Sequence, residues 1–521
     1  MASKYAGYMG KVMMVDLTTE TVTEYPWTDE QRELYLGGKI MAARILCDHL
    51  TGKETAFSEE NWVVIATGPL TGTGAPSSAR FDISALSPQT GILASSNCGG
   101  SFGFHLKKAG YDALILKGKC RSHRWLEIND GAFLFHDADE LWGLKVGPCQ
   151  ERLAELVGKK RFGKLCIGPA GENLVKYAGV ISDERAAGRT GMGAVLGWKN
   201  LKAITASGTK TIPIHDKEKT AAWCKKWIEY LQKHPLTGEQ LPRMGTAGLV
   251  SSMQMIGILS TKNYSAGRFE DFEKVSGELL AEGSKRLSEK YGGKEFAIHS
   301  KGLELAAYEP RRAVGQGLGY AVSNRGGCHL NGGYMVIMEG LGLHMDSQTP
   351  KAKADLTMTF QDLMETISAS GQCLFTSYAF FPGFLLTKPN GIVTKTVNAA
   401  APHIGWAVRL INKCPRIAAL HLPIFQHTKM IELALGMKMD FGRYIEIGER
   451  GYTMERYINT KFGISAANDK LPKRLTDVPQ DPGNPKTKVP LETMKKTYYQ
   501  ARGWDHNGIP TEKLLRRLKI K

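Results

Sequence analysis

The spacing of apolar residues changes along this chain, from short runs before about residue 210 to longer helical periods after about residue 215. Four early apolar runs are strand-like and are bounded by Gly, Pro or polar turns: 62–65, 113–116, 165–167 and 177–181. Segments 217–234 and 279–291 instead space leucines and charges as an amphipathic helix does. The pattern predicts an α+β protein whose β-rich N-terminal domain is followed by mainly α-helical domains.

Length and charge narrow the classes of function. The 521 residues suffice for about three ordinary domains, and the hydrophobic share of 42% excludes global disorder. Lys and Arg outnumber Asp and Glu by 68 to 51, an excess that attracts anions such as nucleic acid, an acidic protein or a phosphate-bearing cofactor. No basic stripe interleaved with aromatics accompanies this charge, so we do not expect nucleic-acid binding.

Neither a membrane span nor an export signal is expected. The longest apolar run, 378–386, contains Pro382 and Gly383 and is too short to cross a bilayer as a helix. The first residues lack the apolar stretch of a secretory signal, which predicts a cytoplasmic location.

The nine cysteines are scattered, and no two are separated by only two or three residues. This spacing predicts reduced thiols and excludes a local hairpin of metal ligands. The cysteines are Cys47, Cys98, Cys120, Cys149, Cys166, Cys224, Cys328, Cys373 and Cys414.

The segment 185–195, Arg-Ala-Ala-Gly-Arg-Thr-Gly-Met-Gly-Ala-Val, is the first candidate for chemistry. Arg185 and Arg189 present planar cations that suit phosphate, and the glycines permit close backbone approach. If the segment opens a helix, the four-residue spacing places both guanidinium groups on one face. It therefore predicts an anionic ligand, and the alternative is a glycine-rich turn with solvated arginines.

Further glycine-rich segments share this character. The stretches 74–80 and 95–101 could be ligand-facing loops or ordinary turns. The stretch 323–329, Ser-Asn-Arg-Gly-Gly-Cys-His, ends on His329, which could exchange a proton near neutral pH or serve as a structural histidine. Cys373 follows a glycine at a helix or a helix break, where a buried cysteine is often only a small apolar residue.

Taken together, these motifs resemble the aldehyde:ferredoxin oxidoreductase family of tungsten-pterin enzymes. The similarity extends over nearly the whole chain, and the motifs occur in the family's order. They are Arg80 in Ser-Ser-Ala-Arg, 96–100, 185–195, Gly302-Leu-Glu-Leu before Tyr308-Glu-Pro-Arg, 323–329 and the closing segment 498–510.

The resemblance implies a β-rich base for a tungsten, or molybdenum, bis-pterin cofactor whose metal is held by dithiolene sulfurs. It implies three domains: a pterin-binding domain at 1–210, a truncated helical domain at 211–298 and a helical C-terminal domain at 299–521. The implied cofactor-binding residues are Arg80, Asn97, Gly99, Arg185, Ala186, Gly188, Arg189, Arg325, Gly371, Gln372 and Leu374.

The chain departs from the family pattern at one internal position. The family's three closely spaced cysteines are absent, and 275–282 runs directly into 283–292, as if a segment had been lost. Cys373 matches a distant fourth ligand of a [4Fe-4S] cluster, but such a cluster normally needs four thiolates. A second subunit could supply the others, or the cluster could be absent. Ser368 also stands where the family commonly has aspartate.

The resemblance implies oxidation of an aldehyde to a carboxylate, with electrons passed to ferredoxin or a similar iron-sulfur acceptor. His329 would donate or orient a proton, and the basic surplus would steer an acidic electron carrier. Related branches reduce aromatic thioesters, so the side chain of the substrate is open. A homodimer or larger assembly is implied. The alternative is a non-catalytic, structural paralogue that keeps the pterin-binding residues without the electron relay.

Overall fold

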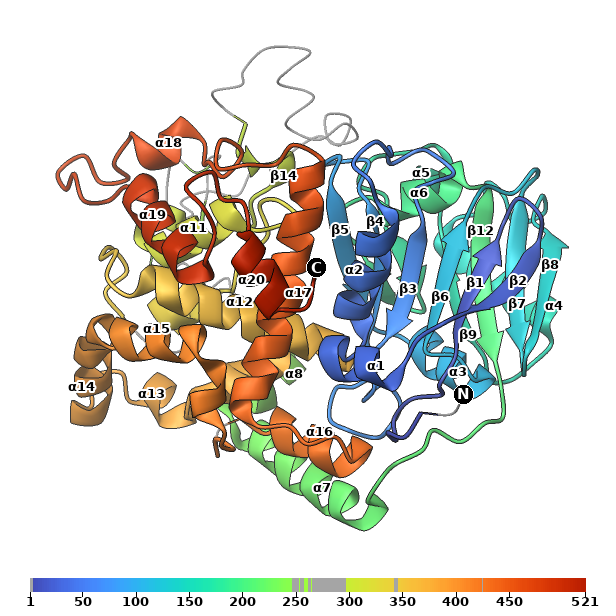
Figure 1. Cartoon of the computed structure of the whole chain (residues 1–521), viewed down its shortest axis with the longest axis horizontal. Coiled ribbons are helices and arrows are strands. Elements are labelled where there is room, and N and C mark those ends of the chain that lie inside the picture. Colours follow the sequence, from blue (N-terminus) through green and yellow to red (C-terminus); the bar gives the residue numbers. More distant parts are fainter. Residues whose placement is uncertain are drawn as a thin grey trace. The chain divides into compact units, whose positions relative to one another are not determined.

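The structure is a computed structural model that describes residues 3–245, 253, 257–260, 264, 297–341, 345–423 and 425–521. The chain divides into two compact units, whose elements Figure 1 labels. Unit 1 comprises Met1–Cys224, Glu365–Cys373 and Lys429–Met439, and unit 2 comprises Lys225–Met364, Leu374–Thr428 and Asp440–Lys521. The predicted division at residues 210 and 298 stays a prediction. The predicted helix at 279–291 lies outside the described residues.

Unit 1 contains a first sheet of six strands in which β1 and β6 are parallel and the other neighbours antiparallel. The register of β4 and β5 places Asp82 opposite Asn97, a pairing that shapes the site described below. The strands, in spatial order, are β2 (Thr21–Tyr25), β1 (Val12–Asp16), β6 (Ala113–Lys117), β3 (Val63–Thr67), β4 (Phe81–Leu86) and β5 (Leu93–Cys98).

A second six-stranded sheet follows in the same unit, and here only β12 and β7 are parallel. In spatial order its strands are β11 (Arg185–Ala187), β10 (Val180–Ser182), β9 (Gly163–Cys166), β12 (Leu201–Ser207), β7 (Arg124–Asn129) and β8 (Ala132–Asp137). All four strands predicted from apolar runs are confirmed, although the run at 177–181 becomes a strand only from Val180.

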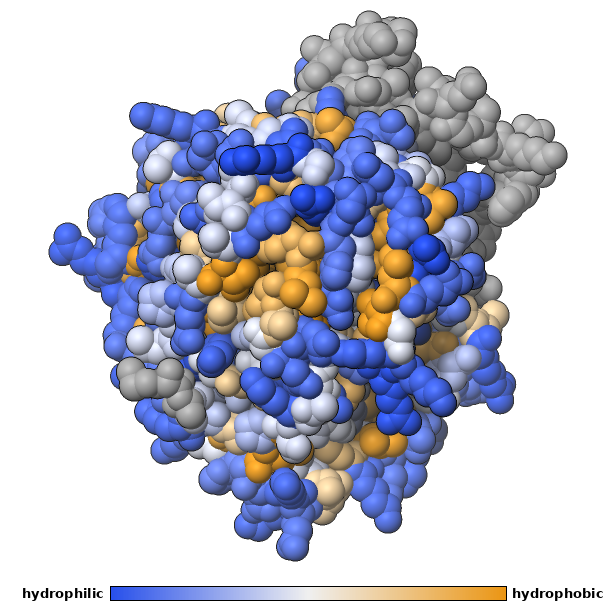
Figure 2. All heavy atoms as spheres, turned by 90° about the vertical axis from the view of Figure 1, so that its right-hand side faces the viewer, coloured by the Kyte–Doolittle hydropathy of each residue, from blue (hydrophilic) through white to orange (hydrophobic). Residues whose placement is uncertain are grey.

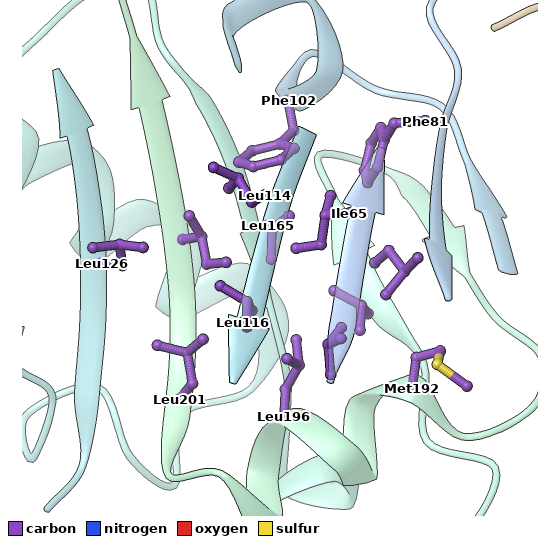
Figure 3. Packing of buried hydrophobic residues seen from close by; sticks show 14 of the residues in the cluster. Ile65, Phe81, Phe102, Leu114, Leu116, Leu126, Leu165, Met192, Leu196 and Leu201 are labelled. Carbon is purple, nitrogen blue, oxygen red and sulfur yellow. The ribbon is translucent and has the colours of Figure 1, made fainter. Parts of the chain in front are cut away.

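The core of unit 1 lies between the two sheets (Figure 3). Helices α3 (Phe102–Ala109) and α6 (Met192–Trp198) add apolar side chains to it. Fully burying one such aliphatic side chain stabilises the fold by about 1.5–3 kcal/mol relative to exposure. Members labelled in Figure 3 are Ile65, Phe81, Phe102, Leu114, Leu116, Leu126, Leu165, Met192, Leu196 and Leu201.

Shorter helices complete the first part of unit 1. Helix α2 (Gly38–His49) packs on β3 and β4, and α5 (Pro169–Glu172) packs on α6. The remaining helices are α1 (Asp29–Tyr35) and α4 (Val146–Val157).

Two segments from far along the sequence return to unit 1. The first is the end of α12 (Lys353–Ser370), where the carbonyl oxygen of Ser370 accepts a 3.0 Å hydrogen bond from the amide of Leu70. The second includes the end of α16 (His427–Leu435), where the amide of His215 donates to the carbonyl oxygen of Ala434 at 2.9 Å. Unit 1 is therefore assembled from three separate parts of the chain.

Unit 2 is mainly helical. Its longest described helix is α17 (Phe441–Lys461), which begins where the side chain of Asp440 accepts from the amide of Arg443 at 2.8 Å. Helix α7 (Lys217–Lys233), which runs from unit 1 into unit 2, confirms the helix predicted at 217–234.

The other elements of this part are α8 (Leu241–Met244), β13 (His299–Ser300), β14 (Leu303–Glu304), α11 (Val314–Val322), α13 (Gly383–Thr387), α14 (Ile392–Ala400), α15 (Gly405–Lys413), α18 (Lys473–Thr476), α19 (Leu491–Arg502) and α20 (Glu512–Arg517). A β-rich first part followed by helices confirms the predicted α+β class.

The surface agrees with the charged composition. The face drawn in Figure 2 is largely hydrophilic, with separate hydrophobic areas between the polar side chains. Among the described residues, no helix is both long enough and apolar enough to cross a membrane.

Candidate functional site

Arg80 and Asn97 meet at the edge of the first sheet. Arg80 directly precedes β4, and Asn97 lies on the neighbouring strand β5. The Nη1 atom of Arg80 donates to Oδ1 of Asn97 at 3.2 Å. Both side chains are half-buried, so the guanidinium group keeps a face on which a ligand could bind.

The loop after α12 brings Cys373 to the same guanidinium group. Nη2 of Arg80 donates to Sγ of Cys373 at 3.1 Å, and the backbone amide of Arg80 donates to the carbonyl oxygen of Gly371 at 3.1 Å. Helix α12 ends at Ser370, and Gly371 has a φ of +88°, which confirms the predicted helix break. A Cβ at Gly371 would overlap Oγ1 of Thr71, so this close approach requires glycine.

Gln372 is buried, and its Nε2 donates to the carbonyl oxygen of Pro76 at 3.1 Å. Its side chain therefore ties two loops together. Leu374, which was also predicted to contact the cofactor, begins the segment that belongs to unit 2.

Arg185 and Arg189 do not lie on a helix, so the condition for a shared helix face is not met. Arg185 belongs to strand β11, and α6 begins only at Met192, after Gly191 with a φ of +77°. The hairpin of β10 and β11, in which Ser182 pairs with Arg185, keeps this backbone extended. Arg185 is exposed and Arg189 half-buried.

Gly99 lies between two of the predicted arginines. A Cβ at this position would be 3.5 Å from Cγ of Arg185 and 3.7 Å from Nε of Arg80. Strand β5 contacts β11, and the amide of Arg189 donates to Oγ of Ser96 at 3.4 Å. The structure thus brings together a set of residues that we call the cradle: Arg80, Asn97, Gly99, Arg185 and Arg189.

The backbone beside the cradle is exposed at two positions that the motif assigned to cofactor binding. Ala186 and Gly188 are exposed, and beyond its chain neighbours a Cβ at Gly188 would meet only Cβ of Ala186, at 3.6 Å. A ligand can therefore approach this stretch of backbone closely.

The donor set of the cradle fits an anionic, phosphate-bearing pterin. Among the described residues, neither Arg80 nor Arg185 forms an ion pair, and the partners of Arg80 are an amide oxygen and a sulfur. Guanidinium groups without a carboxylate partner retain their charge for a phosphate. Asn97 and the nearby backbone add the polar groups that a bicyclic pterin ring needs.

The donor set does not fit a [4Fe-4S] cluster. Within the described part of the chain, no three His, Cys, Asp or Glu residues are grouped so that they could hold a metal ion. This part of the chain therefore shows no ligand set of the size that such a cluster requires.

Asp82 is a site residue that the sequence reasoning missed. Its carboxylate is 1% exposed and accepts from Nδ2 of Asn97 and from Oγ of Ser368, both at 3.2 Å. Burial raises the pKa of Asp82, whereas the charge of Lys39 opposes that rise. An acidic residue within an otherwise uncharged strand, two positions after Arg80, was the available signal.

Arg325 and His329 lie in unit 2. Nη2 of Arg325 donates to Sγ of Cys328 at 2.8 Å. The ring centroid of the half-buried His329 lies 5.5 Å from that of Tyr308 and 5.4 Å from that of Tyr334.

The hydroxyls of three tyrosines, two of which contact His329 through their rings, lie next to one another. The hydroxyls of Tyr308 and Tyr334 are 3.2 Å apart, and those of Tyr334 and Tyr378 are 2.7 Å apart. Burial raises the pKa of Tyr334, so its phenol stays protonated and can donate a hydrogen bond.

Comparisons with known proteins agree with the motifs. Residues 12–208 match the aldehyde ferredoxin oxidoreductase N-terminal domain, and residues 222–280 and 276–520 match domains 2 and 3 of the same family. Tungsten-containing aldehyde ferredoxin oxidoreductases of Pyrococcus abyssi and Pyrococcus horikoshii are each 31% identical to the chain, with 98% of both sequences covered.

Two further similarities are more limited. The WOR-like subunit of an aliphatic sulfonate oxidoreductase of Pyrococcus furiosus is 34% identical over 41% of this chain and 36% of its own length. The active site complex BamBC of benzoyl coenzyme A reductase, solved with 1,5-dienoyl-CoA, contains a chain with a TM-score of 0.63 and 20% identity, and 99% of this chain and 97% of that chain are covered. This last likeness concerns the fold.

The comparisons also confirm the internal loss expected from the sequence. The alignment with the Pyrococcus abyssi protein has 639 positions, which exceeds the 521 residues of this chain by 118. The match to domains 2 and 3 comes in two parts, 222–280 and 276–520, which meet at 276–280, where the sequence lacks the expected cysteine motif. The chain therefore belongs to the aldehyde ferredoxin oxidoreductase family, although it lacks this internal segment.

Proposed function

We propose that the chain is a tungsten-pterin oxidoreductase that oxidises an aldehyde to a carboxylate and passes the electrons to ferredoxin or a similar iron-sulfur acceptor. The observation that carries this proposal is the cradle, in which Arg80 and Arg185 flank Gly99 without a carboxylate partner among the described residues. The relatives of nearly full coverage are named tungsten-containing aldehyde ferredoxin oxidoreductases, which supports the choice of metal and substrate.

In this proposal the cradle binds the cofactor through its phosphates and ring edges. Arg80, Arg185 and Arg189 provide cations for phosphate, and Asn97 provides an amide for the ring. The exposed backbone at Ala186 and Gly188 permits close approach. When bound, the tungsten centre supplies two-electron redox chemistry.

The remaining predicted contacts have different proposed roles. Gly371 allows the loop after α12 to reach Arg80, and Gln372 fixes that loop to Pro76. Arg325 and Leu374, from unit 2, stay proposed as further cofactor contacts.

His329 is proposed to donate or orient a proton for the reacting oxygen. Oxidation of an aldehyde consumes water and releases a carboxylate, protons and two electrons, so a group that titrates near neutral pH is useful. The rings of Tyr308 and Tyr334 contact the imidazole, and the hydroxyls of these two tyrosines lie 3.2 Å apart.

The missing cysteines favour a second candidate function, a structural paralogue that binds the cofactor and does not turn over. Among the described residues no group of ligands for such a cluster is found, so this part of the chain shows no electron relay of the expected kind. In the catalytic proposal a partner subunit supplies that relay. We also propose that the protein forms a homodimer or a larger assembly in the cytoplasm.

Elemental analysis of anaerobically purified protein tests these alternatives. Tungsten, molybdenum, iron and acid-labile sulfide are measured per chain, and turnover is assayed with a panel of aldehydes and a viologen dye. Tungsten with aldehyde-dependent dye reduction is expected. Tungsten without any turnover supports the structural paralogue, and folded protein with neither metal after growth with both sinks the cofactor assignment.

The role of His329 is tested separately with His329→Ala and His329→Gln. If His329 handles a proton, both variants retain tungsten and lose most turnover, because an amide cannot replace a titrating imidazole. Full turnover by a metal-loaded variant contradicts the proposed role.

A further inference from the structure

The buried carboxylate of Asp82 lies behind the cradle and is surrounded by neutral hydrogen-bond donors. Nδ2 of Asn97 and Oγ of Ser368 each approach it at 3.2 Å, and Oγ of Ser95 approaches at 3.3 Å. A carboxylate accepts hydrogen bonds and donates none, so its position dictates which end of each neighbour faces it.

This dictates the orientation of the Asn97 amide. Because the NH₂ group of Asn97 donates to Asp82, the amide oxygen points to the opposite side, where it accepts from Nη1 of Arg80 at 3.2 Å. Arg80 is fixed at a second point by its Nη2 contact with Cys373. A continuous chain of hydrogen bonds thus runs from Asp82 through Asn97 to Arg80.

The charges around Asp82 leave no place for another carboxylate. Lys39 pairs with Glu365 at 2.8 Å, and both side chains are buried. Lys39 also stabilises the charge of Asp82, so this one cation already serves two acidic side chains. An aspartate at 368 would place a second carboxylate against that of Asp82, and two such groups in contact cannot both ionise without a large penalty.

We propose that Asp82 is the positioning residue of the cradle: through Asn97 it holds the guanidinium group of Arg80 toward the anionic cofactor, and position 368 is a serine because Asp82 already supplies the carboxylate there. The cofactor part of this inference rests on the proposed function. The part that concerns Arg80 does not, because it is carried by contacts within the protein.

The test compares four variants. Asp82→Asn removes the charge with little change in shape, and Ser368→Asp adds the competing carboxylate. The double variant Asp82→Ser/Ser368→Asp exchanges the two residues of this hydrogen bond, so the carboxylate lies at position 368 and the hydroxyl at position 82. Asp112→Asn is the matched control, because Asp112 is 2% exposed, accepts from the backbone amides of Met9 and Gly10 and, within the described part of the chain, forms no hydrogen bond with a cradle residue.

The first readout is tungsten, molybdenum and pterin per chain. In both single variants the cofactor content per chain is expected to fall about tenfold, a loss typical when the orientation of a binding residue is disturbed. In the double variant the cofactor content is expected to return to at least half of the wild-type value. Asp112→Asn is expected to keep it, since that carboxylate orients no cradle residue.

The second readout needs no cofactor. In protein grown without tungstate and molybdate, iodoacetamide labelling of Cys373 is followed by mass spectrometry, with exposed Cys414 as the internal standard. A guanidinium group beside a sulfur promotes its reaction, so Asp82→Asn and Arg80→Met are expected to slow labelling of Cys373 several-fold and leave that of Cys414 unchanged.

The outcomes separate the two proposals. If wild-type protein holds neither metal yet Asp82→Asn slows labelling, the proposed function fails and the positioning role stands. If Asp82→Asn changes neither cofactor content nor labelling, the positioning role is overturned. Should Asp82→Asn not fold, the double variant decides, because its failure to regain cofactor and labelling together overturns the exchange of carboxylates.

Discussion

Two pairs of arginines, one pair from each unit, are used in opposite ways. In unit 2, Arg456 and Arg502 are fully buried, and each forms a close ion pair with an aspartate, Asp469 at 2.8 Å and Asp362 at 2.6 Å. In unit 1, Arg80 and Arg185 remain accessible, and among the described residues neither meets a carboxylate.

The difference separates cations that serve the fold from cations that serve a ligand. A buried ion pair has no net charge, and the fold is strongly destabilised when one partner is removed. An arginine whose partners are neutral keeps its positive charge, which can bind an anion. Net charge alone does not show this distinction, because both kinds of arginine contribute equally to the excess of +17.

The largest expected effect comes from Asp469→Asn. The carboxylate of Asp469 contacts Arg456 and Lys301 and accepts from the hydroxyl of Tyr499 at 2.7 Å, so its loss leaves two buried cations without compensation. We expect the free energy of unfolding to fall by about 3–5 kcal/mol at neutral pH. Urea unfolding followed by circular dichroism measures it, and a loss below about 1 kcal/mol would contradict the structural role.

The same aspartate predicts the pH dependence of unit 2. The adjacent cations hold the pKa of Asp469 well below its ordinary value. Its stabilising contribution is therefore complete above the unfolded pKa of about 3.9 and is lost as the pH falls below that value. Wild-type protein should lose stability more steeply than Asp469→Asn between about pH 4 and pH 2.

A smaller loss is expected for Gly371→Ala. Its φ of +88° disfavours any side chain, and the added methyl would overlap Thr71. We expect a destabilisation of about 1–3 kcal/mol. Gly99→Ala is the comparison, because its methyl would meet neighbours only at 3.5 Å and beyond, and it should reduce cofactor content without changing the thermal midpoint.

Arg185→Met sharpens the contrast between the units, because it should affect the ligand and leave the fold unchanged. The side chain is exposed on β11, so stability should change by no more than about 0.5 kcal/mol. Tungsten per chain should fall several-fold. A large loss of stability with unchanged metal content would place Arg185 among the structural arginines instead.

The smallest effect is expected for Arg152→Gln. Arg152 is 42% exposed and pairs with Glu140, which is 46% exposed, at 2.8 Å. Water and salt screen such a pair. No measurable change in unfolding midpoint or metal content is expected, which makes this variant a reference for the others.

Much of unit 1 follows from local patterns in the sequence. The apolar runs at 62–65 and 113–116 became β3 and β6, since short strands in a buried sheet are continuously apolar. Among the cradle residues, Arg185 and Arg189 had a local signal in their glycine-rich segment, whereas Arg80, Asn97 and Gly99 were expected only through the family resemblance.

What the sequence did not reveal depends on contacts between distant residues. Asp82 and Ser368 are separated by 286 positions and meet only because α12 ends against β4 and β5. The condition for a shared helix face at Arg185 fails for a similar reason: pairing with β10 keeps those residues extended, although the glycine spacing suits a helix start.

Because unit 1 is assembled from three separate parts of the chain, it is completed only late in translation. Arg80 and Cys373 are 293 residues apart, so at roughly 5–20 residues per second their contact forms on the order of 15–60 s after Arg80 is made. Until then the loop of Gly371 is absent from the sheet edge. A ligand that needs the completed set of contacts can therefore be inserted only late in translation or after release, and a protein truncated at residue 224 would present an open sheet edge in its place.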